Sequence, residues 1–481
     1  MSMKLSNGKE IPIEMHKTRM VQKVTLQPVE RRLKAIGEAG YNTFQLRTPD
    51  VFLDMLTDSG VNAMSDNQYA AMMKVDDAYA GSMTFYEFAD AVKDILGYNY
   101  VMNVHQGRAA EHLIAKVFEK QGDAVPTNYH FTTTKVHIEV TGGAACLEIY
   151  YDEALQTEST NPFKGNMDPR KLKAVINKYG KDRVSYVRME ATTNLLGGQP
   201  FSMANLKEIK QICKENGLML VIDGSLLCEN AYLIMQREKG YENKTVAEIV
   251  KEMCSYADLF YMSGRKNTCV RGGCIATNNK ELFERIQPWL PVYEGFFTYG
   301  GMSQREVAAM GVGMREMVDP DLAGCAVEQI KYFVDRLKET KIPVVTPPGG
   351  LACHLDAKRF LPNIPQSEYP AGALTAALYI ASGIRGMERG TVSMERDKEG
   401  KEVFADLELC RIALPRRVYS MSHIEYAVDR INWLYKHRNL VRGLKFVFEP
   451  PVLRFFIGKL EPLDNWGLAL AEAYEQEMGK H

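Results

Sequence analysis

The sequence predicts an α/β domain built on a parallel sheet, joined to a smaller α+β domain. Two observations support this. From about residue 97 onward, short apolar runs alternate with amphipathic stretches, which is typical of strands and helices in turn. After about residue 320 this alternation gives way to a less regular order of elements. In a sheet of the first kind, ligands bind at the carboxyl ends of the strands.

Three strand and helix pairs define the first part. A buried strand is expected over 98–104, followed by a helix whose apolar residues recur at helical spacing (Ala110, Leu113, Ile114, Val117 and Phe118). Ser202 is expected to cap a second helix that ends at Gly217, before a strand over 218–223. The third pair is a helix at about 245–254 and a strand over 258–262.

The second part is expected to contain four further elements and a polar hairpin tip at 394–402. The elements are helices at about 324–339, 368–382 and 422–437 and a strand over 409–415. The first 50 or so residues carry no core of their own. We therefore expect them to pack on this second part or on a partner subunit.

Composition narrows the class of protein. The 481 residues are 46% hydrophobic and 25% charged with a net charge of −1, so nothing favours nucleic acid or an anionic membrane. No apolar run is long enough to span a bilayer, and the first residues lack the apolar run of a signal peptide, so a cytoplasmic protein is expected. The nine cysteines never occur as CxxC, and we interpret them as buried thiols rather than disulfides or a zinc site.

An aspartate at a strand end and a lysine one α/β unit later suggest cofactor chemistry. Pyridoxal phosphate requires a lysine amine for its Schiff base and a carboxylate that keeps its ring nitrogen protonated. Asp223 and Lys266 have that relation in the chain. The alternative for the same residues is a helix-capping aspartate and a surface lysine.

Three more segments are candidates for binding. Gln106, Gly107 and Arg108 stand where a strand meets a helix, where free N–H groups can hold a phosphate, and Ser263 is a further candidate. A tight turn or a cap explains the same residues equally well. Phe131, within three threonines, could stack on a cofactor ring or belong to an ordinary half-buried strand.

Arg411 lies inside an apolar strand and needs an anionic partner. A substrate carboxylate is one such partner, and a structural ion pair is the alternative. The nine histidines show no HxxxH or HxH spacing, which argues against a metal site.

Taken together, the segments resemble one family, the β-eliminating lyases that include tyrosine phenol-lyase and tryptophanase. The resemblance covers nearly the whole chain, and its motifs include LTDSGVNAMSD (56–66), HQGRAAE (105–111), FTTT (131–134), NLLGGQPFSMAN (194–205), ADLFYMSGRK (257–266), GMERG (386–390) and RGLKFVFEP (442–450). The family implies a fold-type I pyridoxal phosphate enzyme, similar to aspartate aminotransferase in its large domain.

The resemblance also implies roles for individual residues. Lys266 would form the Schiff base and remove the Cα proton; Asp223 would pair with the ring nitrogen. The other implied cofactor contacts are Phe131 on the ring, Asn194 near its 3′ oxygen, and Gln106, Gly107, Arg108 and Ser263 on the phosphate. Tyr79, contributed across a subunit interface, would protonate the leaving ring carbon. Arg411 would bind the substrate carboxylate, with Thr57 and Ser59 nearby.

Arg389 places the chain closer to tyrosine phenol-lyase than to tryptophanase. In the family, Arg389 and Thr132 would hold the hydroxyl of a phenol, and the implied apolar walls are Phe44, Met387, Phe455 and Phe456. A solvent-facing arginine is the alternative for Arg389.

Several positions depart from the family pattern. Leu226 replaces an arginine near the cofactor oxygen, Arg265 replaces a lysine, and the loop 269–274 is one residue short. The family potassium site, near Gly60, Asp77 and Arg271, is therefore in doubt. Arg271 is a candidate substitute for the cation.

The combined prediction is a homotetramer with active sites shared across a dimer interface. The cofactor-binding domain would span 58–320, and 1–57 with 321–481 would form the arm and small domain. The expected reaction is β-elimination from L-tyrosine or a ring-substituted tyrosine. The alternatives are another leaving group such as indole, an aminotransferase, or a non-catalytic homologue.

Overall fold

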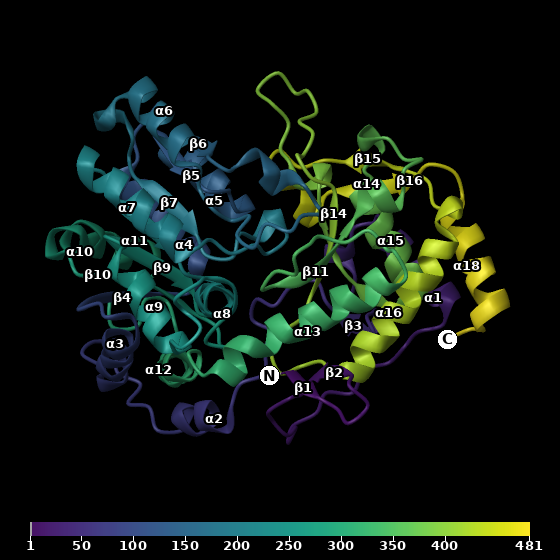
Figure 1. The fold of residues 1–481 in the computed structure, drawn as a ribbon, viewed down its shortest axis with the longest axis horizontal. Coiled ribbons are helices and arrows are strands. Elements are labelled where there is room, and N and C mark those ends of the chain that lie inside the picture. Colours follow the sequence, from purple (N-terminus) through teal and green to yellow (C-terminus); the bar gives the residue numbers. More distant parts are fainter. Residues whose placement is uncertain (1) are drawn as a thin grey trace.

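The computed structural model, which describes residues 2–481, has a large sheet towards one end and a small sheet towards the other. Helix α13 (Pro320–Glu339) runs between the two parts (Figure 1). The chain therefore passes from the first to the second sheet at about the residue where the sequence pattern changes.

The large sheet has seven strands in the order β4-β10-β9-β8-β7-β5-β6. Their bounds are β4 Tyr100–Val104, β5 Ala124–Thr127, β6 Ala145–Glu148, β7 Val187–Glu190, β8 Leu220–Asp223, β9 Leu259–Ser263 and β10 Gly273–Thr277. Strand β10 runs antiparallel to both β4 and β9. The prediction of a wholly parallel sheet is therefore wrong in this one strand, because the chain turns back after Lys266 in a short loop instead of crossing over through a helix.

Helices cover both faces of this sheet because its strands are apolar on both sides. Helix α4 (Gly107–Phe118) packs its apolar residues against Val221 and Leu259 on one face. On the opposite face, α7 (Met203–Asn216) and α9 (Val246–Ser255) pack with Leu220 and Ile222. The same cluster includes side chains of α3 (Met83–Leu96), α6 (Pro169–Tyr179), α8 (Leu227–Arg237) and α12 (Gln304–Glu316).

The expected elements of this part are confirmed, with small shifts at their ends. Ser202 caps α7 by accepting a hydrogen bond from the backbone N–H of Asn205. Gly217 ends the helix with φ +67°, a conformation in which a side chain would be strained. Phe131 does not lie in a strand, since it precedes the short helix α5 (Thr132–Val136).

The second part contains a three-stranded antiparallel sheet in the order β11-β14-β13. The strands are β11 Ala352–Asp356, β13 Met387–Arg389 and β14 Leu409–Ala413. The expected helices are confirmed as α13, α15 (Pro370–Ser382) and α16 (Met421–Lys436). The polar stretch 394–402 lies in the long connection between the antiparallel partners β13 and β14.

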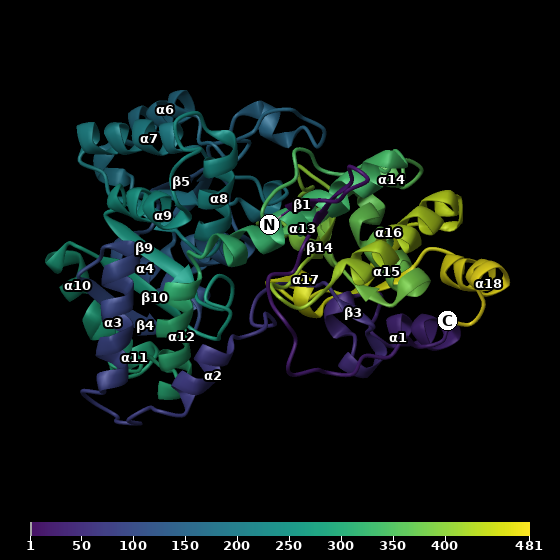
Figure 2. The same ribbon diagram turned by 60° about the horizontal axis from the view of Figure 1, so that its bottom comes forward.

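The first 50 residues pack on the second part, as expected from their lack of a core. Helix α1 (Val29–Glu38) lies against α15 and α18 (Trp466–Met478), which Figure 2 shows side by side. The buried Arg32 donates from Nε to the carbonyl of Ile380 at 2.8 Å. Apolar residues from Val29 to Met55 share one cluster with residues from Ala326 to Tyr474.

A buried group of charges joins segments that are far apart in the sequence. Arg416 pairs with Glu229 of α8 and, at 3.0 Å, with Asp58. All three side chains are at most 3% exposed. Loss of one partner from such a group typically costs about 3–5 kcal/mol, because the remaining charges stay buried without compensation.

Shorter elements complete the fold between and around these helices and strands. They are β1 Ser2–Lys4, β2 Glu10–Pro12, β3 Leu53–Asp54, α2 Asp66–Met72, α10 Lys280–Ile286, α11 Leu290–Tyr293, α14 Ala357–Phe360, β12 Ile384–Arg385, β15 Leu444–Phe448, α17 Arg454–Ile457 and β16 Lys459–Pro462.

Two expectations from composition concern the whole chain. All nine cysteines are free and buried, which confirms their interpretation as isolated thiols. Across residues 2–481, none of the helices has the length and apolar character that crossing a bilayer requires.

Candidate active site

A cavity of about 240 Å³ lies between the carboxyl ends of the large-sheet strands and the strands β13 and β14. Sixteen of the residues predicted from the sequence line it. They are Phe44, Thr57, Ser59, Gln106, Gly107, Arg108, Phe131, Asn194, Asp223, Ser263, Lys266, Met387, Arg389, Arg411, Phe455 and Phe456. Segments separated by up to several hundred residues therefore meet at one site.

The start of α4 forms an anion cradle at one end of this cavity. Strand β4 leads into Gln106, and the helix begins at Gly107, so its first N–H groups are free of partners within the helix. A Cβ built on Gly107 would lie 3.0 Å from Cβ of Ser263, and a side chain at this position would close the space between helix and strand β9. The backbone amides and the Ser263 hydroxyl suit a phosphate group.

Asp223 ends strand β8 in the floor of the cavity. Its Oδ2 accepts from Arg188 at 2.6 Å and from the hydroxyl of Tyr261 at 3.0 Å, and its Oδ1 accepts from the Ser225 N–H at 3.0 Å. Burial alone would raise the pKa of Asp223, but Arg188 and Lys266 outweigh it and hold the pKa below its usual value. A carboxylate has about four acceptor positions, so Asp223 retains one for a ligand.

Lys266 lies in the loop between β9 and β10, with Nζ 5.4 Å from the centroid of the Phe131 ring. The neighbouring residue fixes the loop, since Asn267 donates to Glu229 at 2.7 Å within the buried charge group. The amine, the aromatic ring and the Asp223 carboxylate thus line a single cavity.

Arg411 enters the cavity from β14. It donates to Oδ1 of Asn194 at 2.7 Å and to the carbonyl of Leu56 at 2.9 Å, while its Nε has no partner within residues 2–481. Burial lowers the pKa of Arg411 to about 10, and Asp58 opposes that shift. The guanidinium is buried and its hydrogen-bond acceptors are neutral. Because its charge is not balanced by these acceptors, it is suited to bind an anionic group of a ligand.

Arg389 enters from the neighbouring strand β13. It donates to the hydroxyl of Thr132 at 3.1 Å and lies about 5.5 Å from the ring centroids of Phe131 and Phe455. Burial, together with the nearby Arg411, lowers its pKa well below the usual range. Thr132 therefore belongs to the site through Arg389, and Arg389 is buried instead of facing solvent.

Aromatic side chains close the cavity beside Arg389. Phe44 packs edge-on against Phe455 and Phe456 at ring distances of 5.4 and 4.9 Å, and Met387 lies on β13. This wall can bury an apolar ring, and Arg389 supplies a polar contact at its edge.

Four predicted residues lie away from the cavity. Tyr79 is 71% exposed and packs on Phe296 and Tyr299. Asp77 and Arg271 are also exposed, and no ion pair joins them in the described part of the chain. Gly60 lies directly against the guanidinium of Arg265, which takes up the space beside it.

Leu226 packs in an apolar cluster with Leu351, Ala352 and Ala413 and does not line the cavity. Its neighbourhood could not hold an arginine side chain without repacking.

Five cavity-lining residues were not predicted from the sequence: Asp58, Glu111, Thr133, Glu190 and Ser225; a sixth, Arg265, was noted only as a departure from the family pattern. Arg188, which contacts Asp223, was missed as well. The missed signal lies in the segment Tyr186–Ala191, where two charges interrupt an otherwise apolar strand. Charged residues in a buried strand require partners, so Arg188 and Glu190 could have been identified as site residues.

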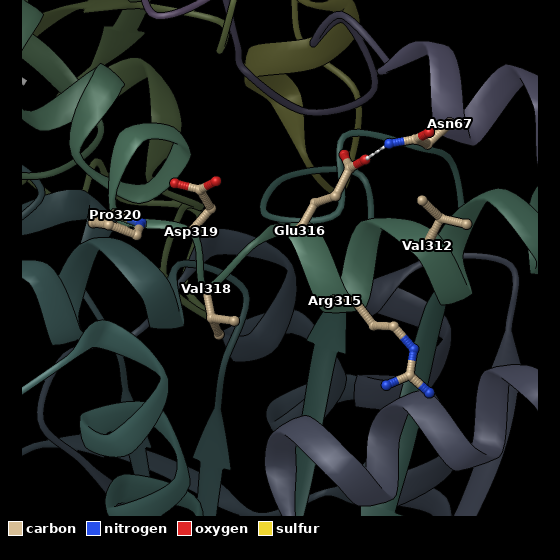
Figure 3. Close-up of a pocket in the computed structure, with 7 residues that line it drawn as sticks. All are labelled: Asn67, Val312, Arg315, Glu316, Val318, Asp319 and Pro320. Atoms are coloured by element: carbon tan, nitrogen blue, oxygen red, sulfur yellow. Dashed lines mark hydrogen bonds between the residues drawn. The ribbon is translucent and has the colours of Figure 1, made fainter.

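A larger depression lies elsewhere on the surface, where α12 ends and α13 begins (Figure 3). Arg315 points away from Glu316, which accepts from Asn67 of α2 at 3.4 Å. None of the predicted site residues lines it, so we do not assign the active site there. Within residues 2–481 there is also no cluster of three or more histidine, cysteine or acidic residues that could hold a metal ion.

Comparison with known proteins gives a family match and close relatives. The profile of the family described as Beta-eliminating lyase matches residues 54–430. The tyrosine phenol-lyase of Symbiobacterium thermophilum is 45% identical over 452 residues, covering 94% of this chain and 98% of the relative. The tyrosine phenol-lyase of Pasteurella multocida is 43% identical, covering 94% and 99%.

Solved structures match the fold at much lower identity. The serine palmitoyltransferase of Sphingomonas wittichii is 14% identical with a TM-score of 0.56, covering 81% of this chain and 88% of that one. A high-resolution structure of SPT with PLP gives a TM-score of 0.54 at 14% identity, with coverage of 81% and 88%. At this identity the likeness concerns the fold alone.

Proposed function

The chain belongs to the β-eliminating lyase family, and from that premise we propose that it converts L-tyrosine, or a ring-substituted tyrosine, to a phenol, pyruvate and ammonium. It is a pyridoxal phosphate-dependent carbon–carbon lyase of fold type I. The choice of a phenol as the leaving group is supported by one observation above all, the buried Arg389 with its hydroxyl partner Thr132 beside an aromatic wall.

The residues present fit pyridoxal phosphate. Gly107 leaves the phosphate cradle open, Asp223 keeps an acceptor position for the ring nitrogen, and Phe131 offers a ring face. Gln106, Arg108 and Ser263 would complete the phosphate contacts, and Asn194 would lie near the 3′ oxygen. When bound, the cofactor supplies an aldehyde that condenses with an amine and a ring that draws electrons from the substrate Cα.

Residues of the chain would bind the substrate and transfer the protons. Arg411 would bind the substrate carboxylate through a bidentate pair of hydrogen bonds, with Thr57 and Ser59 beside it. This pairing would fix the orientation of Cα. Lys266 would take the proton from Cα as general base. Arg389 and Thr132 would hold the ring hydroxyl and its proton while the ring carbon that carries the side chain is protonated.

The bond that breaks joins the substrate Cβ to the ring. We propose that the partner subunit's Tyr79 delivers the proton to the leaving ring carbon. This role is supported by the exposure of Tyr79 in the single chain, where its ring packs with Tyr299 outside the cavity. The three-carbon remnant takes up water and yields pyruvate and ammonium. Phe44, Met387, Phe455 and Phe456 would exclude other water from the ring.

We further propose a homotetramer with active sites shared across a dimer interface, and a cytoplasmic location in keeping with nine free thiols. Residues 58–320 would form the large domain, and 1–57 with 321–481 the small one. The division is supported by separate apolar clusters, one of which unites the first 55 residues with the chain beyond residue 326. Closure of the two would bring Arg389 and Arg411 onto the substrate.

The potassium site of the family would lie near Gly60, where this chain places a guanidinium. Arg265 fills the space beside Gly60, and the pKa of Arg265 is lowered by burial and by the positive charges of Arg271 and Arg108. We propose that guanidinium groups take over the role of potassium in this protein, with Arg265 nearer to the site than Arg271. Activity that rises strongly and saturably with potassium but not with sodium would contradict this.

The test of the proposed function is an assay of the purified holoenzyme with a panel of amino acids. L-tyrosine should give phenol and pyruvate in equal amounts, together with ammonium. Indole released from L-tryptophan would instead support the tryptophanase-like alternative, and conversion of a keto acid without ammonium would support an aminotransferase. The absence of pyruvate from tyrosine, ring-substituted tyrosines and S-alkyl cysteines would contradict the lyase proposal and favour a non-catalytic homologue.

A further inference from the structure

Strand register gathers a row of polar groups beneath the proposed cofactor site. Glu190 of β7 pairs in register with Asp223 of β8, and Asp223 pairs with Tyr261 of β9. Residues paired across neighbouring strands point to the same face of a sheet, and Arg188, two positions before Glu190, points to that face too. The face is the one that α4 covers.

Arg188 is the centre of this row. Its guanidinium contacts Asp223 at 2.6 Å, the hydroxyl of Tyr261 at 2.9 Å and the hydroxyl of Thr127 at 3.1 Å. Glu190 lies slightly farther away, with Oε2 3.4 and 3.5 Å from the two terminal nitrogens. Arg188 is 1% exposed, so these contacts are shielded from bulk water.

The charges around Arg188 are not balanced if every acid is ionised. Three carboxyl groups, those of Glu111, Glu190 and Asp223, share one guanidinium on this face of the sheet. Lys266 beyond β9 and Arg389 of β13 also act on Glu190 or Asp223 through their fields, but within residues 2–481 no ion pair joins either cation to these acids, so at contact distance the three acids face one guanidinium. One acid is therefore expected to hold a proton near neutral pH.

Glu190 is the acid best placed to exchange that proton. Its Oε1 accepts from the Asn194 N–H at 3.0 Å, and it lines the cavity directly. Burial raises the pKa of Glu190 to about 7, Arg188 opposes the shift and Asp223 adds to it. Burial also raises the pKa of Glu111, but its two oxygens accept from the hydroxyls of Thr133 and Thr134, and it reaches Arg188 only through the Thr134 hydroxyl, which accepts from the guanidinium at 3.3 Å.

We propose that Arg188 and Glu190 are positioning residues that control the charge of Asp223 and through it the state of the bound cofactor. While Glu190 carries a proton, Arg188 pairs with Asp223 alone. Once Glu190 ionises, the guanidinium is shared between two carboxylates and Asp223 becomes a stronger base towards the cofactor ring nitrogen. The inference rests on the proposed role of Asp223.

The visible absorption of the holoenzyme tests this without any turnover. Between about pH 6 and pH 8 the wild-type spectrum should change in a step with a midpoint near 7, where Glu190 titrates. Glu190→Gln should remove the step, because the amide has the same shape and no proton to lose. Glu111→Gln is the matched control: it neutralises the other buried acid of this face and should leave the step in place.

Removal of the Arg188 guanidinium tests whether Arg188 acts on the bound cofactor through Asp223. Arg188→Met should weaken binding of pyridoxal phosphate about tenfold or more, the usual loss when a group that orients a ligand's partner is removed. Arg188→Lys should recover part of the affinity, because it restores the charge without the fork that reaches Asp223 and Tyr261 together. If Arg188→Met does not fold, the lysine and glutamine variants still decide the question.

The outcomes separate this inference from the proposal on which it rests. A wild-type spectrum without a step, or an unchanged step in Glu190→Gln, overturns the inference. If Asp223→Asn alters the spectrum and cofactor affinity while the Arg188 and Glu190 variants do not, Asp223 keeps its role and only the inference fails. If Asp223→Asn leaves both readouts unchanged, the assignment of Asp223 itself is wrong.

Discussion

The two sides of the cavity treat charge in opposite ways. On the large-sheet side, Arg188 contacts carboxylates and hydroxyls from several strands, and Asp223 has three hydrogen-bond donors. On the small-sheet side, Arg389 and Arg411 meet only neutral acceptors, and each has an Nε without a partner in the described residues. Both sides are equally buried.

This difference indicates what each side is built to receive. A buried cation that lacks an anion is unstable unless a ligand supplies one, so the small-sheet side suits the polar ends of a substrate. The large-sheet side has its own counter-charges and suits a ligand that stays, such as a cofactor. Substitutions can disrupt each side separately, and their expected effects on activity, substrate binding and stability differ in size.

The largest effect is expected on the cofactor side. Lys266→Ala should lower kcat by about 10⁴-fold or more, because the general base and the cofactor's anchoring amine are lost together. Steady-state pyruvate release measures this, and Lys251→Ala, which removes an exposed lysine of α9, is the control. A Lys266→Ala enzyme that kept a tenth of wild-type activity would contradict the assignment.

The next effect is expected on the substrate side. Arg411→Lys keeps the charge but cannot reach Asn194, Leu56 and a carboxylate together, so kcat/KM for tyrosine should fall about 100-fold. KM should carry most of the change, and the affinity for pyridoxal phosphate should stay at the wild-type value. Equal losses in substrate and cofactor binding would show that the two sides are not independent.

A smaller and more selective effect should follow from Arg389→Gln. Loss of the charged contact to a ring hydroxyl should lower kcat/KM for tyrosine by about 10–100-fold. S-methyl cysteine has no ring, so its elimination should proceed at nearly the wild-type rate. The ratio of the two rates is the measurement, and a uniform loss on both substrates would argue that Arg389 is structural.

The smallest effect concerns stability in acid. His354 of β11 lies opposite Arg411 in the small sheet, and burial and Arg411 lower its pKa to about 3. A lowered pKa contributes stability above the ordinary value near 6.5, and that stability is lost as the pH falls towards the folded value. His354 should contribute about 1–2 kcal/mol to the loss between about pH 7 and pH 5, so His354→Asn should lose that much less than the wild type, whose other buried histidines still titrate. Denaturant unfolding at the two pH values measures it, and equal losses in both proteins would refute it.

Local signals in the sequence indicated about half of the predicted residues that line the site, and the family resemblance supplied the rest. Gly107 marks a strand–helix junction and Asp223 a strand end, and both occur where expected. The pairing of Arg389 with Thr132 joins residues 257 positions apart and followed only from family resemblance. Strand β10 was missed because it has only five residues and follows a glycine-rich loop. The hydrophobic pattern of so short a run does not predict whether the strand is parallel or antiparallel to its neighbours.

Arg188 and Glu190 were missed for a different reason. Apolar patterns predict which residues are buried, whereas the identity of a buried charge's partner depends on strand order and register. The same limit applies to Leu226, whose apolar surroundings come from residues 351, 352 and 413. Partners of this kind are determined by tertiary structure.

The nine buried thiols can report where the protein unfolds locally. Burial raises the pKa of every one of them, so in the folded state none should react readily with an alkylating reagent. They are distributed over both parts, for instance Cys274 on β10 and Cys353 on β11. The order in which mass spectrometry finds them labelled would therefore show whether one part loosens before the other, without any probe being introduced.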